Sequence, residues 1–459
     1  MSLKGLLFIG LFGLCAAAAL VFPHVGVYGY IVDYCIHPAS QWWGRPFATM
    51  GFRFSFILAL ATMIGMALNW KHLRFGRSAL YPQETTFILF LGLIWFLTLI
   101  SPETAGRYTT TDHPSVKFAK IAIFTLMMTH VILDLKKLNG LFWVLSSTAL
   151  FLGIKAWSLP YGRFVRGRLE GIGGADFSEA NFFGAFMAAM LPIIAVQFLS
   201  SKNWVVKLYA LACGAFTANA VILCRSRGAF LGVAAGALAA LFAAPKRHRK
   251  KIIVLLFVGL IGGVYLTDSI FIERMLSISF KQEEMDTSTL SRIELWKAGA
   301  RMLADNPLGI GPGNWYQTIG LYMPQYDGRD SHSTYVKCAV ELGIPGILLF
   351  LLLIFQAYIN LRRVHNEAKK LPPREADDIT QYYFAVMVSL AVLLACALAI
   401  TMIYTEIVWI LLMLPVCLAR AFENALADSQ AAVKAEVEIK ETAGFTDAPC
   451  HVKEEAKTF

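Results

Sequence analysis

One polar segment, residues 268–344, holds side chains suited to acid–base chemistry on a phosphate-containing substrate. It contains His332 and Glu341. It also carries four arginines: Arg274, Arg292, Arg301 and Arg329. Histidine readily takes a proton from a hydroxyl near neutral pH, and a guanidinium matches the oxygens of a phosphate. A single histidine is also compatible with a structural role, and Glu341 could orient it, cap its helix or pair with an arginine.

Apolar residues at helical spacing predict a helix over residues 287–303 of this segment. Ser291, followed three residues later by Glu294, fits a capping box. This would place Arg292 in the first turn, where the helix dipole favours an anion. The Gly/Pro cluster at 305–315 follows no strand and has no Walker lysine, so it gives little support for nucleotide binding.

The elements that position these residues are predicted to be transmembrane helices. The chain has 459 residues, of which 57% are hydrophobic and 16% charged, as is typical of polytopic membrane proteins. Apolar runs long enough to cross roughly 30 Å of hydrocarbon occur about twelve times. They lie near 4–22, 51–69, 84–100, 116–134, 140–157, 180–199, 204–222, 228–244, 251–267, 345–362, 381–399 and 403–419. We therefore expect an all-α fold, with small residues of the 228–240 stretch packing one helix closely against another.

Basic loops predict the orientation of these helices. The strongest Lys/Arg clusters between spans lie at 246–251 and 362–374 and should be cytoplasmic, which explains the net charge of +10 without invoking nucleic acid. Both termini would then be cytoplasmic and the long loop periplasmic, in a bacterial inner membrane. We expect helices one to nine in 1–267, with a short re-entrant segment near 25–36. We then expect a helical catalytic loop at 268–344, helices ten to twelve in 345–420, and a cytoplasmic tail at 421–459.

Two other outer loops carry arginines against the charge rule. They are Arg163, Arg166 and Arg168 after the fifth helix, and Arg225 and Arg227 between the seventh and eighth. Each alone could be a solvated residue or a contact to lipid phosphates. Their convergence with the arginines of the long loop favours a site for an anionic lipid headgroup. No paired carboxylates that would hold Mg²⁺ or Mn²⁺ are evident on this face, so we expect no metal and no cofactor.

Three short motifs, in this order, resemble the O-antigen ligase and polymerase superfamily of GT-C-like membrane glycosyltransferases. They are residues 225–232 (RSRGAFLG), residues 291–311 with Ser291-Arg292, Trp296 and NPLGIG, and residues 332–346 with HSTY and ELGIPG. The resemblance covers about residues 175–420. The stretch 26–44, with GVYGY, His37-Pro38 and WWG, is similar to exosortase-associated O-glycosylation ligases.

The resemblance implies transfer of a glycan from undecaprenyl diphosphate to an acceptor hydroxyl, in the ligases a sugar of the lipid A core. His332 would be the general base, with inversion at the anomeric carbon. Arg227 and Arg292 would bind the diphosphate and stabilise the leaving charge, with Arg225 in support. Further support is expected from four residues: Glu341, Arg168, Asn181 and Arg329. For Asn181 we favour a helix cap over a glycan contact. The family often has Asn after the histidine, where this chain has Ser333.

Other functions are compatible with the sequence. An O-antigen polymerase or a protein O-oligosaccharyltransferase of the same superfamily would use the same chemistry on another acceptor. A transporter of lipid-linked glycan would be expected to show ionisable groups at mid-membrane and a repeat between its halves. No repeat is evident, and Lys117, Lys120 and Glu406 lie near helix ends. The sequence therefore favours the ligase.

Overall fold

The structure is a computed structural model that describes most of the chain. The described residues are 2–73, 78–101, 108–109, 112–159, 164–165, 167–174, 176–245, 247–267 and 287–442. Arg163, Arg166 and Arg274, named above, lie outside them.

Every apolar run predicted from the sequence is largely helical in the structure. The helices of the N-terminal half are α1 (Leu3–Val21), α2 (Pro23–Ile36), α3 (Arg45–Thr49), α4 (Phe54–Leu68), α5 (Pro82–Ile100), α6 (Pro114–Val131), α7 (Leu135–Ser158) and α8 (Ala180–Ser200). Those that follow are α9 (Trp204–Cys224), α10 (Arg227–Ala243), α11 (Arg249–Leu266), α13 (Thr287–Asp305), α14 (Trp315–Tyr322), α15 (Thr334–Glu367), α16 (Pro373–Ala399) and α17 (Glu406–Thr442). A two-residue hairpin, β1 (Phe164–Val165) with β2 (Arg168–Leu169), precedes α8.

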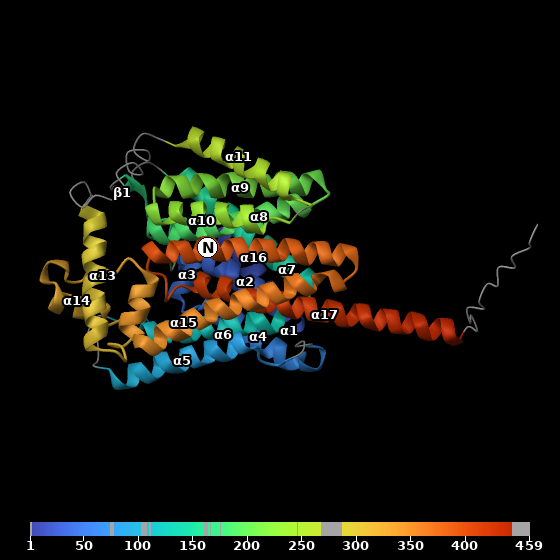
Figure 1. The fold of residues 1–459 in the computed structure, drawn as a ribbon, viewed down its shortest axis with the longest axis horizontal. Helices are drawn as coiled ribbons and strands as arrows, with labels where there is room; N and C mark the ends of the chain where they lie inside the picture. Colours follow the sequence, from blue (N-terminus) through green and yellow to red (C-terminus); the bar gives the residue numbers. More distant parts are fainter. Residues whose placement is uncertain are drawn as a thin grey trace, which may run out of the picture.

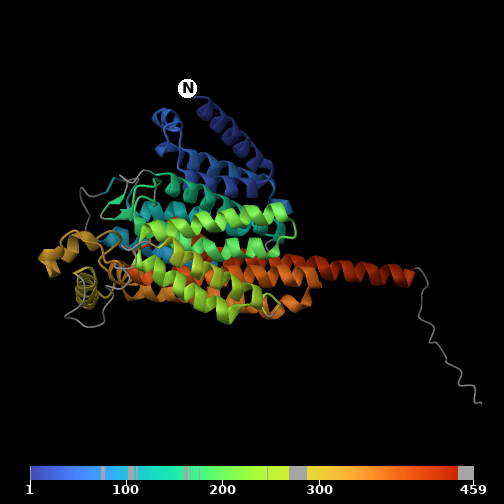
Figure 2. The same ribbon diagram turned by 90° about the horizontal axis from the view of Figure 1, so that it is seen from above.

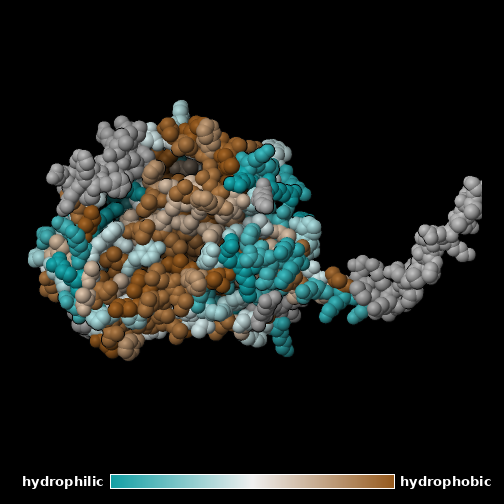
Figure 3. All heavy atoms as spheres, in the orientation of Figure 1, coloured by the Kyte–Doolittle hydropathy of each residue, from teal (hydrophilic) through white to brown (hydrophobic). Residues whose placement is uncertain are grey.

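The protein is an all-α membrane protein. Seven helices of the described part are long and apolar enough to cross a membrane: α1, α5, α7, α8, α9, α15 and α16. Two further apolar helices, α4 and α10, are shorter. Hydrophobic surface covers the middle of the molecule, and hydrophilic residues gather towards both ends of its long axis (Figure 3). The predicted total of twelve spans and the re-entrant segment at 25–36 remain predictions.

Most of the long helices run along the same axis, whereas α13 lies across one end of the bundle (Figure 1). The blue N-terminal helices form one edge of the molecule, and α17 extends beyond the opposite end from α13 (Figure 2). The bundle and the α13 end have separate cores. The second core consists of Leu295, Ala298, Met302, Trp315, Ile319 and Val340. The polar segment is therefore a packed subdomain in its described part.

Close packing of α10 on α16 confirms the role predicted for small residues. A Cβ atom on Gly228 would lie 2.8 Å from Ile400 Cγ1, and one on Gly232 would lie 2.9 Å from the carbonyl oxygen of Val392. Only glycine permits this approach, in which van der Waals contact holds two apolar helices together. The contact fixes the N-terminal end of α10, where Arg227 is the first residue.

A glycine-rich loop holds the polar subdomain against the start of α15. The backbone N–H of Ile310 donates to the carbonyl of Val340 at 3.0 Å, and that of Gly311 donates to the carbonyl of Glu341 at 2.9 Å. A Cβ atom on Gly309 would lie 2.6 Å from the same Glu341 carbonyl oxygen. At Gly343 the backbone turns to φ 69°, which kinks α15. The first part of α15 is thus a short helix clamped by the loop.

The predicted cap of the helix in the polar segment is wrong. The described helix α13 already contains Thr287, so Ser291 lies inside it and Arg292 is not in its first turn. Ser291 is buried, and the Thr-Ser-Thr-Leu stretch before it continues the helix despite its modest helix propensity. The helix dipole therefore does not favour an anion at Arg292.

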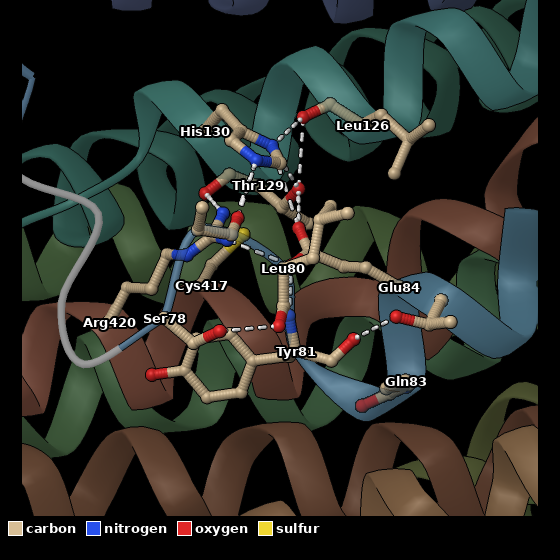
Figure 4. A network of polar contacts seen from close by, with 12 residues as sticks. Ser78, Leu80, Tyr81, Gln83, Glu84, Leu126, Thr129, His130, Cys417 and Arg420 are labelled. Atoms are coloured by element: carbon tan, nitrogen blue, oxygen red, sulfur yellow. Dashed lines mark hydrogen bonds and ion pairs between the residues drawn. The ribbon is translucent and has the colours of Figure 1, made fainter.

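A buried polar network joins α5, α6 and α17 (Figure 4). The side chains of Arg420 and Glu84 are both 0% exposed, and Arg420 Nη2 lies 2.8 Å from Glu84 Oε2. Arg420 Nη1 also donates to the carbonyl of Thr129 at 2.7 Å. Ser101 at the far end of α5 lies beside Gly311. Since Glu84 and Ser101 are separated by about 25 Å of helix, this network lies well away from the polar subdomain.

Candidate functional site

His332 lies at the start of α15 in an unusual backbone conformation. Its φ is 51°, in the left-handed region that few residues with a Cβ adopt. Its backbone N–H donates to Asp330 Oδ2 at 3.2 Å. On its other side, Ser333 caps α15 by accepting a hydrogen bond from the N–H of Val336 at 3.4 Å. These two hydrogen bonds hold the backbone of His332 in place. The imidazole is 38% exposed, so the ring is accessible.

The electrostatic surroundings of His332 favour a neutral ring. Burial lowers the pKa of His332 below its ordinary value. The carboxylate of Asp330 opposes this change in the pKa of His332. Three arginines lower the pKa of His332 further: Arg292, Arg168 and Arg329. A ring that is neutral at neutral pH can accept a proton, which is what a general base requires.

The turn between α9 and α10 carries Arg225 in a second left-handed conformation, with φ 44°. Its guanidinium donates to the carbonyl of Gly167 and lies 5.5 Å from the centre of the Phe164 ring. Arg225 is 8% exposed. It therefore ties the turn to the hairpin of β1 and β2. Ser226 then caps α10 by accepting a hydrogen bond from the N–H of Ala229 at 3.4 Å.

Asn181 joins three segments and does not cap a helix. Its Oδ1 accepts hydrogen bonds from Ser226 Oγ, at 2.8 Å, and from Arg168 Nη2. Arg168 Nε in turn donates to the carbonyl of Cys224 at 3.4 Å. The N-cap of α8 is Glu179, without a side-chain capping bond. The cap favoured from the sequence is thus not the role of Asn181, which instead holds Arg168 beside the turn.

Arg227 connects that turn to the polar subdomain. Its Nη1 donates to Thr289 Oγ1 on α13 at 3.4 Å. Thr289 and Arg292 are three residues apart on α13 and so lie on one face of that helix. Arg292 thus lies one helical turn along α13 from the residue that Arg227 contacts. Arg301, about 14 Å further along α13 and exposed, lies outside this group.

In the described part of the chain Glu341 pairs with no arginine and does not cap its own helix, but its carboxylate binds the N–H of the first residue of α14. It is 0% exposed, and its carboxylate accepts the N–H of Trp315 at 3.3 Å and the hydroxyl of Tyr404 at 2.8 Å. Lys337 Nζ lies 3.9 Å from Glu341 Oε1. These contacts give Glu341 a supporting role: it fixes the short helix that follows His332.

Arg329 lies at the exposed rim of the site. Its backbone carbonyl accepts Trp315 Nε1–H at 2.9 Å, and its guanidinium lies 5.2 Å from the centre of the Tyr326 ring. Sequence reasoning did not identify its neighbour Asp330, nor Lys337, which is 4% exposed and lies 3.4 Å from Asp330 Oδ1. The available signal was Asp330 two residues before the histidine, a spacing that permits a local side-chain to backbone bond.

Comparison with known families matches the same part of the chain. Residues 212–351 match the model of a family described as O-Antigen ligase. The matched residues include the turn with Arg225 and Arg227, the helix with Arg292, and His332. The match confirms the resemblance to the O-antigen ligase and polymerase superfamily that was inferred from the three motifs. No curated protein matches the chain.

Proposed function

We propose that the protein is an O-antigen ligase. It transfers a glycan from undecaprenyl diphosphate to a hydroxyl of lipid A-core, with inversion and without a metal, during lipopolysaccharide biosynthesis. The observation that carries the proposal is the accessible His332 ring, beside which Arg292 and Arg168 are close enough to lower its pKa. A base next to several phosphate-binding groups suits an acceptor hydroxyl that attacks a diphosphate-linked sugar.

In the proposed reaction, His332 takes the proton of the acceptor hydroxyl while the acceptor oxygen forms a bond to the anomeric carbon. The bond from this carbon to the diphosphate oxygen breaks, and undecaprenyl diphosphate leaves with the electron pair. Arg227 and Arg292 bind the diphosphate and stabilise its growing charge. Fixed cations aimed at a developing charge lower the barrier because they need no reorganisation during the step.

The supporting residues have distinct roles in this proposal. Arg225 holds the α9–α10 turn against Gly167, so it positions Arg227 and does not itself bind the diphosphate. Asn181 and Arg168 stabilise the same turn, and Glu341 anchors the short helix after His332. Arg329 contributes positive charge at the rim. In this proposal Arg227, and not Arg225, is the arginine of the RSR motif that faces the donor.

The topology completes the proposal. The site lies on the periplasmic face of the inner membrane, where the polar subdomain covers one end of the bundle (Figure 1). About twelve spans cross the membrane, and both termini are cytoplasmic. The donor reaches the site from the surrounding lipid, since undecaprenyl chains dissolve in hydrocarbon. This arrangement fits the hydrophobic band between two hydrophilic ends (Figure 3).

The proposal is tested by transfer with purified protein. The full-length protein is given undecaprenyl-diphosphate-linked glycan and lipid A-core from a strain without O-antigen, in the presence of EDTA. We expect glycosylated lipid A-core with an inverted anomeric linkage. Parallel reactions offer a non-reducing glycan end or a serine-containing peptide as acceptor. Product on either of these alone would contradict the ligase assignment, loss of transfer with EDTA would contradict the metal-free mechanism, and donor movement without bond formation would indicate a transporter.

A further inference from the structure

A buried lysine lies directly behind the loop that carries His332. Lys337 is 4% exposed, and its Nζ lies 3.4 Å from Asp330 Oδ1 and 3.9 Å from Glu341 Oε1. The same atom lies 4.0 Å from the centre of the Tyr316 ring. A buried ammonium is stable only when it is paired and solvated by such groups. Lys337 is therefore fixed in one place, and so are the groups that surround it.

Asp330 uses its two carboxylate oxygens for different purposes. Oδ1 accepts the Tyr316 hydroxyl at 2.9 Å and faces Lys337. Oδ2 accepts the backbone N–H of His332 at 3.2 Å and lies 3.9 Å from its Nδ1. Burial alone would raise the pKa of Asp330, but the charge of Lys337 and several hydrogen bonds hold this pKa below its ordinary value. Asp330 is thus an immobilised carboxylate on the Nδ1 side of the imidazole.

Two consequences follow for His332. The bond from Asp330 to an N–H two residues later is an Asx-type turn, which stabilises the left-handed conformation of the histidine. The negative charge near Nδ1 favours the tautomer that carries its proton on this nitrogen. The lone pair then resides on Nε2, which is the nitrogen left to accept a proton. Orientation and tautomer are both set by one carboxylate.

We propose that Asp330, clamped by Lys337 and Tyr316, is a positioning residue that presents Nε2 of His332 to the acceptor hydroxyl. The inference rests on the proposed function, in which His332 is the base. Asp330 touches neither donor nor acceptor. It acts by holding the histidine backbone and by keeping the proton of the neutral ring on Nδ1. Nε2 is then the unprotonated nitrogen that can accept the proton of the acceptor.

Other charged groups near His332 also change its pKa. Arg292 from α13, Arg168 from β2 and Arg329 from the same loop all lower the pKa of His332. Glu179, before α8, is an acid whose pKa is raised first by burial and then by Asp330. Removal of the Asp330 charge takes away the group that favours protonated His332. The pKa of His332 must therefore fall in Asp330→Asn and rise when an arginine is neutralised.

The first experiment measures this titration without substrate. Diethyl pyrocarbonate reacts with neutral imidazole, and mass spectrometry quantifies the modification of His332 in the intact protein as the pH is varied. We expect the midpoint to move to lower pH in Asp330→Asn and to higher pH in Arg329→Gln. The matched control is Asp327→Asn, an exposed carboxylate on the same loop, which should leave the midpoint unchanged. An unchanged midpoint in Asp330→Asn would overturn the positioning role.

The second experiment measures transfer by the same variants, with the donor and acceptor given above. We expect the turnover rate of Asp330→Asn to fall about 100-fold or more, because a base with the wrong tautomer or orientation is ineffective. The double variant Asp330→Asn/Lys337→Met also removes the lysine charge, which after the first substitution keeps only Glu341 as an acidic neighbour. The melting temperature of the double variant should be higher than that of Asp330→Asn, but its turnover rate should remain as low. Recovery of turnover would show that Asp330 only neutralises Lys337, which would overturn the proposal.

The two proposals fail in different ways. If His332→Asn retains transfer, the proposed base is wrong whatever the titration shows. If His332→Asn abolishes transfer but Asp330→Asn titrates and turns over like the unmodified protein, the base stands and the positioning role of Asp330 is wrong.

Discussion

At the scale of single residues, two proposed site residues have a backbone conformation that costs free energy. His332 and Arg225 have φ values of 51° and 44°, and among described non-glycine residues only His37 shares this feature. A left-handed conformation costs roughly 1–2 kcal/mol for a residue with a Cβ. Such strain persists only where neighbouring contacts enforce it, and it gathers at functional sites. Asp330 enforces it at His332, and Gly167 binds the side chain of Arg225.

Substitution of Arg225 separates the backbone cost from the role of the side chain. In Arg225→Gly the strained conformation becomes favourable, whereas in Arg225→Ala it remains strained. We expect the glycine variant to be more stable than the alanine variant by about 1 kcal/mol. Both should lose transfer to a similar extent because both lack the bond to Gly167. Thermal melting and transfer rates measure the two effects. Equal stability of both variants, or full activity of either, would contradict this description of Arg225.

At the scale of elements, the sequence predicted the helices better than their contacts. The apolar runs are long and nearly continuous, so burial in hydrocarbon determines them locally. Arg227 and His332 were predicted as site residues from residue type and expected side of the membrane, and they stay predictions. The buried position of Lys337 was not predictable, because a lysine in an amphipathic helix usually faces water. Only the packing of α14 and the glycine-rich loop against the start of α15 encloses it.

Asn181 and Ser291 show a related limit. Both are residue types with strong preferences for helix ends, and both were assigned caps on that basis. In the structure Asn181 binds Arg168 and Ser226, and Ser291 lies within α13. Tertiary contacts decide the outcome at such positions, since a cap contributes only about 1 kcal/mol.

The contact of α10 with α16 should control the position of Arg227. Gly232→Leu inserts a side chain where the carbonyl of Val392 would lie 2.9 Å from the new Cβ, so the helices must separate. We expect a loss of about 1–3 kcal/mol in stability and a lower transfer rate. Gly259→Leu on α11 is the matched control, because nothing lies within 4 Å of a Cβ there. A thermal melt of both variants decides the matter: similar melting temperatures would show that the glycine contact has no such role.

At the scale of the whole molecule, the bundle has polar structure at both ends. At one end lie α13, α14 and the start of α15, near His332. The network of Arg420 and Glu84 (Figure 4) lies well away from it, since about 25 Å of α5 separates Glu84 from Ser101. The hydrophobic band lies between the two hydrophilic ends (Figure 3). A lipid-linked donor and an acceptor on the membrane surface meet most readily at the end that carries the polar subdomain. This arrangement fits a position of His332 at a membrane surface, and the periplasmic side remains part of the proposal.

The topology is tested by labelling of introduced cysteines. Asp327→Cys lies on the exposed loop before His332, and Ala432→Cys lies on the exposed part of α17. A membrane-impermeant maleimide added to spheroplasts should label Asp327→Cys at once. It should label Ala432→Cys only after permeabilisation. The described native cysteines are buried except the half-buried Cys15, and the unsubstituted protein gives the background. The opposite labelling pattern would place the site in the cytoplasm.

The central claim is that His332 is the base for transfer onto a donor held by arginines, and one comparison of variants tests it most directly. His332→Asn is the best substitution, because asparagine accepts the left-handed backbone but cannot take up the proton. In the transfer assay with undecaprenyl-diphosphate-linked glycan and lipid A-core, we expect its turnover to fall about 100-fold or more. Its affinity for the donor should be unchanged, whereas Arg292→Gln should bind the donor more weakly. Near-normal turnover of His332→Asn would contradict the account.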